Sequence, residues 1–206
     1  MAPAKVIALK EPTNGGEEAI SHSEPYAAVI TIEGAADFLF HRWNAEAVDT
    51  KAAAAKNSKA KKTDDVESYV YRTLDGALAI PGEYFRGSII NAAKFRQDPR
   101  SPRKSAMDLF KAGVVGMNDL CCLGVKDWDY IDRRRVMVQR NGITRTRPAF
   151  HEGWSCEMSL MVNLPGYINE SDLLETLTMA GKVIGVGDFR PTYGRFQVTS
   201  FEVQQD

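Results

Sequence analysis

Residues 154–181 read WSCEMSLMVNLPGYINESDLLETLTMAG, a strand pattern followed directly by a helix pattern. Every second residue of the first half is apolar, which is typical of a strand with one buried face. The members of that face are Trp154, Cys156, Met158, Leu160, Val162 and Leu164. After Pro165-Gly166, Asn169 is suited to cap a helix, with Asp172 three residues on, and Gly181 is placed to end it. The stretch therefore predicts a one-sided strand joined to a helix.

Further strand and helix patterns lie on both sides of this unit. Residues 26–33 (YAAVITIE) predict a strand, and residues 193–203 predict a last strand with a bulge at Thr199–Ser200. A helix begins near Glu83, where Gly87 indicates close approach of another backbone, and residues 104–112 predict a second short helix. The order strand, helix, two or three strands, helix, strand predicts an α+β fold. We expect a ferredoxin-like or RRM-like βαββαβ core in a single domain over residues 1–206.

Residues 135–147 (RVMVQRNGITRTR) carry the strongest hairpin signal, because Asn141-Gly142 suits a type I′ turn. Neither face of this hairpin is cleanly apolar, so we expect an arm over about 133–148 that projects beyond the core. In the expected register the facing pairs are Arg140 with Ile143, Val138 with Arg145, and Val136 with Arg147.

Charge is distributed unevenly along the 206 residues, although the net charge is only -1. Residues 86–147 hold 14 basic and 6 acidic side chains, net +8, while residues 1–50 and 148–206 each hold 3 basic and 8 acidic ones, net -5. Residues 44–66 carry five lysines and little apolar bulk, which predicts a mobile, basic, exposed insertion. Because phosphate binding depends on local charge, the basic centre keeps a nucleic-acid partner open; a coincidence of surface charges is the alternative.

Other protein classes find little support in the sequence. No apolar run is long enough to span a membrane, and the first ten residues lack the pattern of a secretory signal, so we expect a cytoplasmic protein without a membrane partner. Cys121, Cys122 and Cys156 suggest reduced thiols rather than a disulfide framework. No cysteine or histidine pair has zinc-ligand spacing, so we expect no metal and no cofactor.

Residues 185–196 (GVGDFRPTYGRF) form the densest group of residues with binding chemistry. Glycines allow tight turns and close approach to a ligand, arginines bind phosphates, and aromatic rings can stack on unpaired bases. The pattern is not a dinucleotide fingerprint, because Arg190 stands where the third glycine would be and the loop follows a helix. A glycine-rich connection into the last strand, with Phe196 in the core, is the simpler alternative.

These features together resemble the RAMP superfamily of CRISPR effector proteins, especially the backbone subunits that line the guide RNA. Residues 80–93 (IPGEYFRGSIINAA) resemble that family's helix entry, and residues 185–194 resemble its C-terminal glycine-rich loop. The basic insertion at 44–66 follows the first strand, where family members carry a variable loop. The resemblance covers about residues 26–203. The chain is shorter than many backbone subunits, and no histidine lies at an obvious position for the cleavage chemistry of the guide-processing members. A phage or mobile-element relative, or a shortened subunit, would fit these departures.

The resemblance implies a backbone subunit that binds single-stranded RNA, the guide, within a ribonucleoprotein for antiviral defence. Its implied partners are single-stranded nucleic acid, other copies of itself stacked head to tail, and other effector subunits. The candidate glycine-rich loop residues are Gly185, Gly187 and Gly194. The candidate RNA-binding residues are Arg86, Arg140, Arg145, Arg147, Phe189, Arg190, Tyr193 and Arg195.

Two other functions stay open. One is a structural or assembly protein, of phage origin, that uses the hairpin and the basic loop as docking arms. The other is a small RAMP-type endoribonuclease, since some family members cut RNA with an aspartate in the comparable insertion, where Asp49, Asp64 and Asp65 lie here. A loop aspartate is usually only solvated, so no catalytic residue is assigned. The sequence does not distinguish RNA from DNA.

Overall fold

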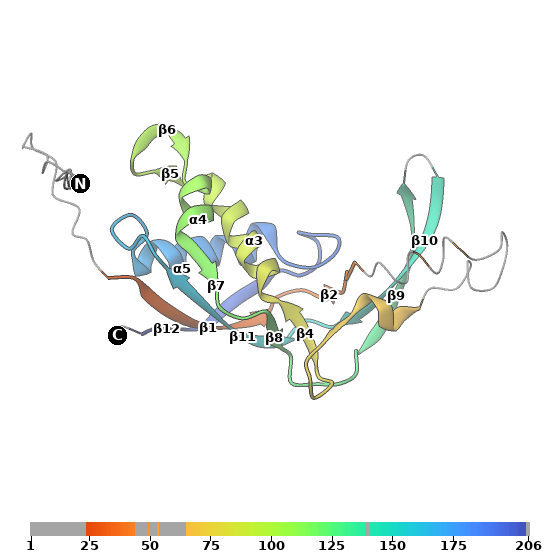
Figure 1. Cartoon of the computed structure of the whole chain (residues 1–206). Helices are drawn as coiled ribbons and strands as arrows, with labels where there is room; N and C mark the ends of the chain where they lie inside the picture. Colours follow the sequence, from red (N-terminus) through yellow and green to blue (C-terminus); the bar gives the residue numbers. More distant parts are fainter. Residues whose placement is uncertain (1–23, 44–48, 50–52, 54–64, 139–140, 205–206) are drawn as a thin grey trace, which may run out of the picture.

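The computed structural model describes residues 24–43, 49, 53, 65–138 and 141–204. A four-stranded sheet carries helices on one face, and a long hairpin extends away to one side (Figure 1). The predicted insertion at 44–66 therefore lies almost entirely outside the described residues, as does Arg140.

The four-stranded sheet is antiparallel and has the order β12-β1-β11-β7. Its strands are β1 (Tyr26–Gly34), β7 (Val114–Gly116), β11 (Ser155–Val162) and β12 (Phe196–Gln204). Apolar residues at every second position of β1 and β11 are buried beneath the helices, as the alternation predicts. The bulge in β12 is confirmed, because Thr31 pairs with Ser200 whereas Ile32 pairs with Val198. The α+β class is confirmed.

Three α-helices of the described chain pack on this sheet: α3 (Gly82–Ala92), α4 (Met107–Gly113) and α5 (Glu170–Met179). The predicted capping box is present, because the Asn169 side chain accepts from the Asp172 backbone N–H and the Asp172 carboxylate accepts from that of Asn169. Gly181 does not end the helix as predicted, since the chain continues as the π-helix η3 (Ala180–Ile184). Gly181 instead allows close packing, because a Cβ there would lie 2.1 Å from the carbonyl oxygen of Phe196.

The remaining elements form smaller sheets and short helices beside the core. One sheet contains β2 (Phe38–Leu39), β10 (Asn141–Phe150) and β9 (Tyr130–Val138), in that order. The others join β3 (Tyr71–Arg72), β4 (Leu78–Pro81) and β8 (Leu120–Cys122), and β5 (Gln97–Asp98) with β6 (Ser101–Ser105). The 3-10 helices are η1 (Val66–Tyr69) and η2 (Ala93–Phe95).

The hairpin forms, but its register differs from the predicted one. Arg145 lies opposite Arg134 rather than Val138, and Arg147 lies opposite Asp132 rather than Val136. Val138 pairs with Asn141, whereas the expected register pairs Arg140 with Ile143. The base of β10 also pairs with β2, where Ala149 lies opposite Leu39, so tertiary contacts act on this strand in addition to the local Asn-Gly preference. The shift is an even number of residues, so Val136 of β9 and Arg145 of β10 still share one face.

Three further features compare with the predictions as follows. The hairpin lies outside the four-stranded sheet, whose fourth strand is the short β7, too brief to show a pattern. The predicted close approach of another backbone at Gly87 is wrong, because a Cβ added there would meet no atom within 4 Å. The predicted second short helix is present but begins at Met107, because Ser101–Ser105 pairs as a strand with β5.

The three cysteines are free thiols. Within the residues that the structure describes, no helix has the length and apolar character to cross a membrane. In that same part of the chain, no three histidine, cysteine or acidic side chains gather as metal ligands.

Candidate nucleic-acid interface

Backbone hydrogen bonds join the glycine-rich loop at residues 185–195 to the segment around β2 and join its two ends to each other. The backbone N–H of Asp188 donates to the Leu39 carbonyl at 3.0 Å, and that of Gly194 donates to the Asp37 carbonyl at 2.7 Å. The Val186 N–H also donates to the Gly194 carbonyl at 2.9 Å, closing the loop on itself. Backbone bonds of this kind give the loop a defined shape.

The three loop glycines are required by this packing. Gly185, Gly187 and Gly194 all have positive φ, of 72°, 80° and 69°. A Cβ on Gly194 would lie 1.7 Å from the Val186 carbonyl oxygen, and one on Gly187 would lie 2.6 Å from that of Leu39. The loop's own fold therefore explains the glycines, and their predicted role beside a ligand stays a prediction.

Two hairpin arginines join this loop to β10. The Asp188 carboxylate accepts from Arg147 Nε at 3.2 Å and from Arg145 Nη1 at 3.4 Å. The Arg147 side chain is only 4% exposed, and its guanidinium lies 4.1 Å from the centroid of the Tyr69 ring. Arg145 is more open, at 30%. The fold thus brings the basic hairpin against the glycine-rich loop, which lies in the acidic C-terminal part of the sequence. A binding site that uses both segments depends on this contact, which the sequence alone did not show.

A third arginine, Arg134 of β9, holds the loop's aromatic rings. Its guanidinium donates to Asp132 Oδ2 at 2.6 Å and to the Tyr193 hydroxyl at 2.7 Å. It also lies 4.8 Å from the Phe189 ring centroid and 4.7 Å from that of Tyr193. The Asp132 carboxylate raises the pKa of Arg134 further above its ordinary value, so the side chain stays cationic. We call Arg134, Arg145 and Arg147, with loop residues 188–193, the hairpin–loop cluster.

Sequence reasoning missed Arg134 as a site residue. The signal that could have found it is the register, since Arg134 shares a face with Arg145 and lies directly opposite it. Two like charges so placed need an acidic or aromatic neighbour, which Asp132 and the loop rings supply. The wrongly predicted hairpin register placed Arg145 opposite Val138 and so hid the pairing of Arg145 with Arg134.

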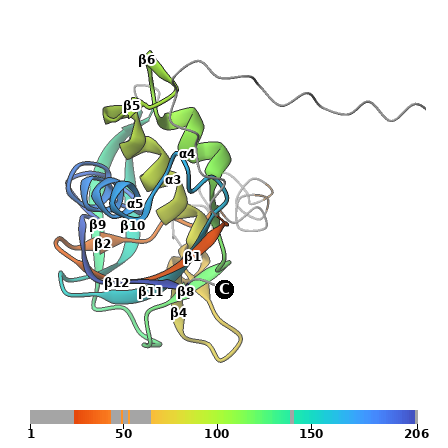
Figure 2. The same cartoon turned by 90° about the vertical axis from the view of Figure 1, so that its left-hand side faces the viewer.

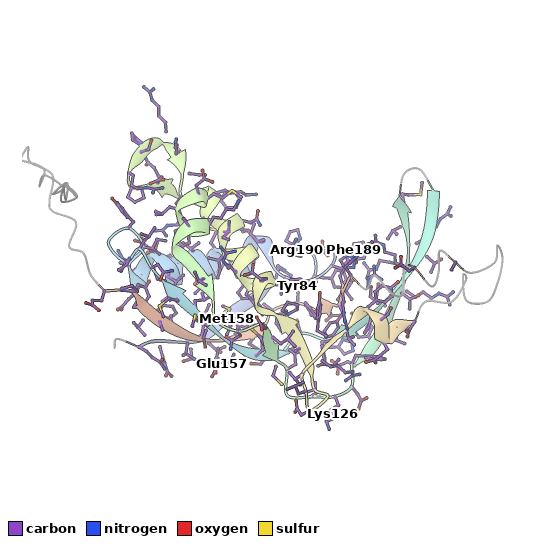
Figure 3. The ribbon with its side chains drawn as sticks, in the orientation of Figure 1. Tyr84, Lys126, Glu157, Met158, Phe189 and Arg190 are labelled. Carbon is purple, nitrogen blue, oxygen red and sulfur yellow. The ribbon has the colours of Figure 1, made fainter. Side chains whose placement is uncertain are left out.

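Arg190 and Arg195 are the exposed basic residues of the loop. Within the described chain, neither side chain makes a hydrogen bond or ion pair. Figure 3 shows Phe189 and Arg190 between the helices and the hairpin, with Tyr84 nearby. Burial raises the pKa of Tyr84, whose hydroxyl donates to the His41 carbonyl at 2.7 Å. Arg190 therefore keeps its guanidinium free for an external anion.

The other predicted residues lie elsewhere. Arg86 donates to the carbonyls of Val114 and Lys111, at 2.8 Å each, and contacts Glu83, so it holds α4 and β7 against α3. Arg140 lies outside the described residues, as does Asp64. Asp49 and Asp65 are exposed.

His41 interacts electrostatically with three charged residues of the cluster, Asp188, Arg147 and Arg145. Burial lowers the pKa of His41, while the nearby Asp188 carboxylate raises it and Arg147 lowers it. Its Nδ1 atom is buried without a hydrogen-bond partner among the described residues. The neutral ring is thus the favoured form in the folded protein.

The open face of the four-stranded sheet has the opposite character. Figure 2 shows the helices on one side of the sheet, leaving the other side uncovered. Glu33, Glu157 and Glu202 alternate with the buried positions and share this open face. The four strands contain no lysine or arginine. Such a surface repels phosphates, so it is unsuited to bind a nucleic-acid backbone.

No family model matches this chain, and no curated protein matches it. Its structure is similar to a chain of the type III-B Cmr-beta structure, determined by cryo-EM with cognate target RNA bound, with a TM-score of 0.51 and 8% identity. The match covers 87% of this chain and 61% of the other. The crystal structure of Cmr6 from Pyrococcus furiosus matches at a TM-score of 0.45 and 8% identity, over 85% of this chain and 99% of the other. The chain therefore shares the fold of a type III-B Cmr-beta chain and spans 61% of its length.

Proposed function

We propose that this chain is a RAMP-type subunit of a CRISPR ribonucleoprotein effector and binds single-stranded RNA. The fold shared with the type III-B Cmr-beta chain supports the proposal, as does the RNA in that structure. The connections β1–α3–β7 and β11–α5–β12, with the order β12-β1-β11-β7, agree with a ferredoxin-like, RRM-like core. Other copies of the chain and other effector subunits are its proposed partners.

The hairpin–loop cluster is the observation that carries the proposal. It joins basic side chains, half-buried aromatic rings and an exposed Arg190 on one side of the molecule. In the proposal Arg190, Arg195 and Arg145 contact phosphates, while Phe189 and Tyr193 offer ring surface to unpaired bases. Arg140 joins the phosphate contacts by its position in the hairpin.

Two predicted contacts take a different role in the proposal. Arg147 is buried against Asp188 and Tyr69, so it positions the loop instead of meeting the RNA. Arg86 likewise supports the helix layer through the carbonyls it binds. Gly185, Gly187 and Gly194 give the loop the shape that presents Arg190.

The path of the RNA follows from the charges of the two faces. An RRM-like fold offers its open sheet face to RNA in many proteins, but here that face carries only glutamates as charged groups. The proposed strand therefore runs along the hairpin–loop cluster and avoids the sheet.

The test compares the Arg190→Ala/Arg195→Ala double variant with wild type on a short fluorescein-labelled single-stranded RNA. We expect roughly a 10-fold or greater loss of affinity, and a salt slope smaller by about 1.4, because each phosphate contact contributes about 0.7 on single strands. Arg103→Ala/Lys104→Ala is the matched control, since it removes two exposed charges from β6, far from the hairpin (Figure 1).

Equal losses in the two double variants would assign the binding to overall charge and remove the loop from the site. Absence of RNA binding by the wild type would overturn the proposal. A nucleic-acid-free oligomer, seen by light scattering and the ratio of absorbance at 260 and 280 nm, would favour the structural protein instead. RNA shortened on incubation would favour the endoribonuclease.

A further inference from the structure

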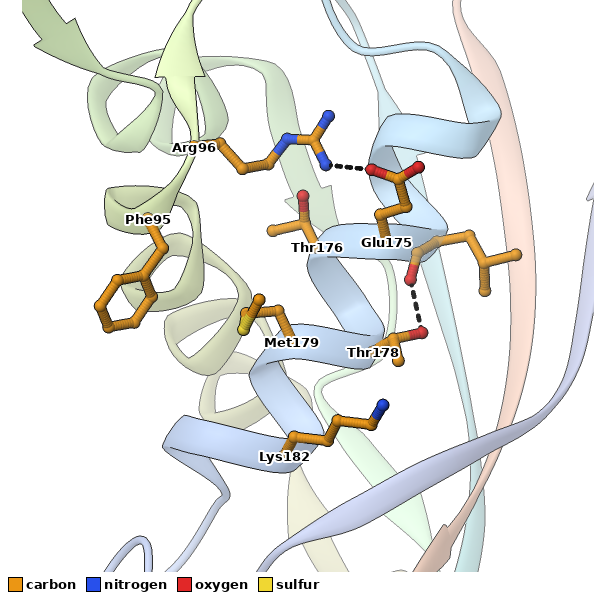
Figure 4. Close-up of a pocket in the computed structure, with 8 residues that line it drawn as sticks. Phe95, Arg96, Glu175, Thr176, Thr178, Met179 and Lys182 are labelled. Atoms are coloured by element: carbon orange, nitrogen blue, oxygen red, sulfur yellow. Dashed lines mark hydrogen bonds and ion pairs between the residues drawn. The ribbon is translucent and has the colours of Figure 1, made fainter.

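An apolar groove lies in the helix layer, where η2 at the end of α3 faces α5. Its volume is about 480 Å³, and Figure 4 shows its walls. Phe95 is 60% exposed on one wall, and Met179 is 41% exposed on the other. The remaining lining residues are Arg96, Leu174, Glu175, Thr176, Thr178 and Lys182. Hollows of this size bind small ligands or single side chains.

The charges at the groove are divided between its ends. Arg96 pairs with both Asp172 and Glu175, so this group of three side chains keeps one negative charge in excess. Lys182 pairs with no carboxylate among the described residues. The Lys182 end of the groove therefore offers an unpaired positive charge beside apolar surface, which suits an apolar side chain followed by an acidic one.

The same chain exposes such a pair at the turn between β3 and β4. Leu74 is fully exposed, at 111% of the reference area, and Asp75 follows it. The Thr73 hydroxyl, by its hydrogen bond, lowers the pKa of Asp75, so its carboxylate is charged at neutral pH. A lone exposed leucine is ordinary on a protein surface. Leu74, however, stands on an ordered turn, where its side chain can reach into a hollow of a neighbouring molecule.

The turn is held in shape by hydrogen bonds. The Thr73 N–H donates to the Ala77 carbonyl at 2.9 Å, and the Gly76 N–H donates to the Thr73 carbonyl at 3.0 Å. Arg72 Nη1 donates to the Gly76 carbonyl at 2.8 Å and also to that of Lys126. Because the turn is preorganised, docking would cost little conformational entropy.

The turn and the groove lie on different sides of the molecule. Figures 1 and 2 show the helices on one side of the four-stranded sheet and the β3–β4 turn beyond the other. A knob and a groove on different surfaces of one chain form a heterologous, head-to-tail contact that can repeat from copy to copy.

We propose that the groove between η2 and α5 receives the Leu74 turn of a second copy of this chain, with Asp75 paired to Lys182. This inference assigns a contact surface to the self-association in the proposed function. The contact between two copies does not require RNA, and the inference rests on the proposed function only for the arrangement of successive copies along an RNA strand. It requires no covalent step and no further component.

The experiment uses the full chain after nuclease treatment, followed by sedimentation velocity over a concentration series. We expect Leu74→Asp and Phe95→Asp each to weaken association roughly 10- to 100-fold, because each replaces an apolar contact with a carboxylate that would lose its water on docking. Met137→Asp is the matched control, since Met137 is also exposed, at 66%, but lies on the hairpin.

Mixing the two variants gives the decisive result. Leu74→Asp keeps an intact groove and Phe95→Asp keeps an intact turn, so the mixture should form dimers that grow no further. Monomeric wild type, unchanged association in either variant, or a mixture that stays monomeric would each overturn the inference. RNA affinity is measured in parallel: wild-type affinity of Leu74→Asp for a short RNA separates this contact from the RNA site, and loss of RNA binding with association intact would sink only the proposed function.

Discussion

The hairpin–loop cluster and the open sheet face are both exposed parts of one domain, yet they are built in opposite ways. The cluster places three arginines against one loop and ties them through Asp188, Asp132 and aromatic rings. The sheet face carries three glutamates that no arginine or lysine of its strands balances. The difference teaches that a net charge of -1 is a sum over two surfaces, each suited to a different kind of partner.

The largest expected effect tests whether the loop is a rigid part of the cluster. Gly194→Ala should destabilise the protein by about 4 kcal/mol, because it combines an unfavourable positive φ with a Cβ 1.7 Å from the Val186 carbonyl oxygen. Gly76→Ala is the matched control, since Gly76 also has a positive φ but open space around it, and should cost about 1 kcal/mol. Urea denaturation measures both. Similar values for the two would show that the loop yields easily.

The next effect tests the buried arginine that links loop and hairpin. Arg147→Ala should cost about 3 kcal/mol, because it leaves the largely buried Asp188 carboxylate with Arg145 as its remaining arginine partner. Arg145→Ala, at a more exposed position, should cost less than about 1 kcal/mol. Thermal or urea unfolding of the two variants gives the comparison. If Arg145 were the costlier loss, the assignment of Arg147 as the positioning residue would fail.

A smaller effect compares acidic groups on the two surfaces. Asp188→Asn removes a negative charge beside the proposed phosphate contacts and should raise affinity for single-stranded RNA about 2- to 5-fold. Glu157→Gln removes one from the open sheet face and should leave that affinity unchanged. Fluorescence anisotropy at low salt measures both. A larger gain from Glu157→Gln would move the RNA path onto the sheet.

The smallest effect concerns pH. Burial keeps the pKa of His41 below its ordinary value in the folded protein, so the unfolded chain binds its proton first as pH falls. His41 therefore contributes a loss of stability as pH falls from just above 6.5 toward its folded pKa. His41→Leu should remove this part of the pH dependence, as measured by urea unfolding at about pH 7.5 and about pH 5.5. An unchanged dependence would assign it to other groups.

Local patterns predicted the core of the fold well. The alternation from Trp154 to Val162 and the Asn169–Asp172 cap are properties of neighbouring residues, and the structure confirms both. Patterns of two or three residues failed, because β7 is too short to alternate and Gly181 serves a contact with distant Phe196. The prediction of a close backbone contact at Gly87 was wrong because a glycine within a helix does not by itself indicate a neighbouring backbone.

The candidate site was only half predictable. The loop residues could be named because glycine, arginine and aromatic side chains have evident binding chemistry, whatever the fold. Their partners could not, because the contact of Asp188 with Arg145 joins residues 43 positions apart and depends on the hairpin register. That register depends on the pairing of β9 with β10 along their whole length, which the Asn-Gly signal alone does not reveal.

Asp172 makes two interactions, and together they link the cap of α5 to the walls of the helix groove. Its carboxylate closes the capping box of α5 and also binds Arg96 on the facing wall. Spreading the walls would therefore break the ion pairs of Arg96, or draw the Asp172 carboxylate away from the Asn169 N–H and so break one of the two bonds of the capping box. The width of the groove is thus linked to the stability of the first turn of α5.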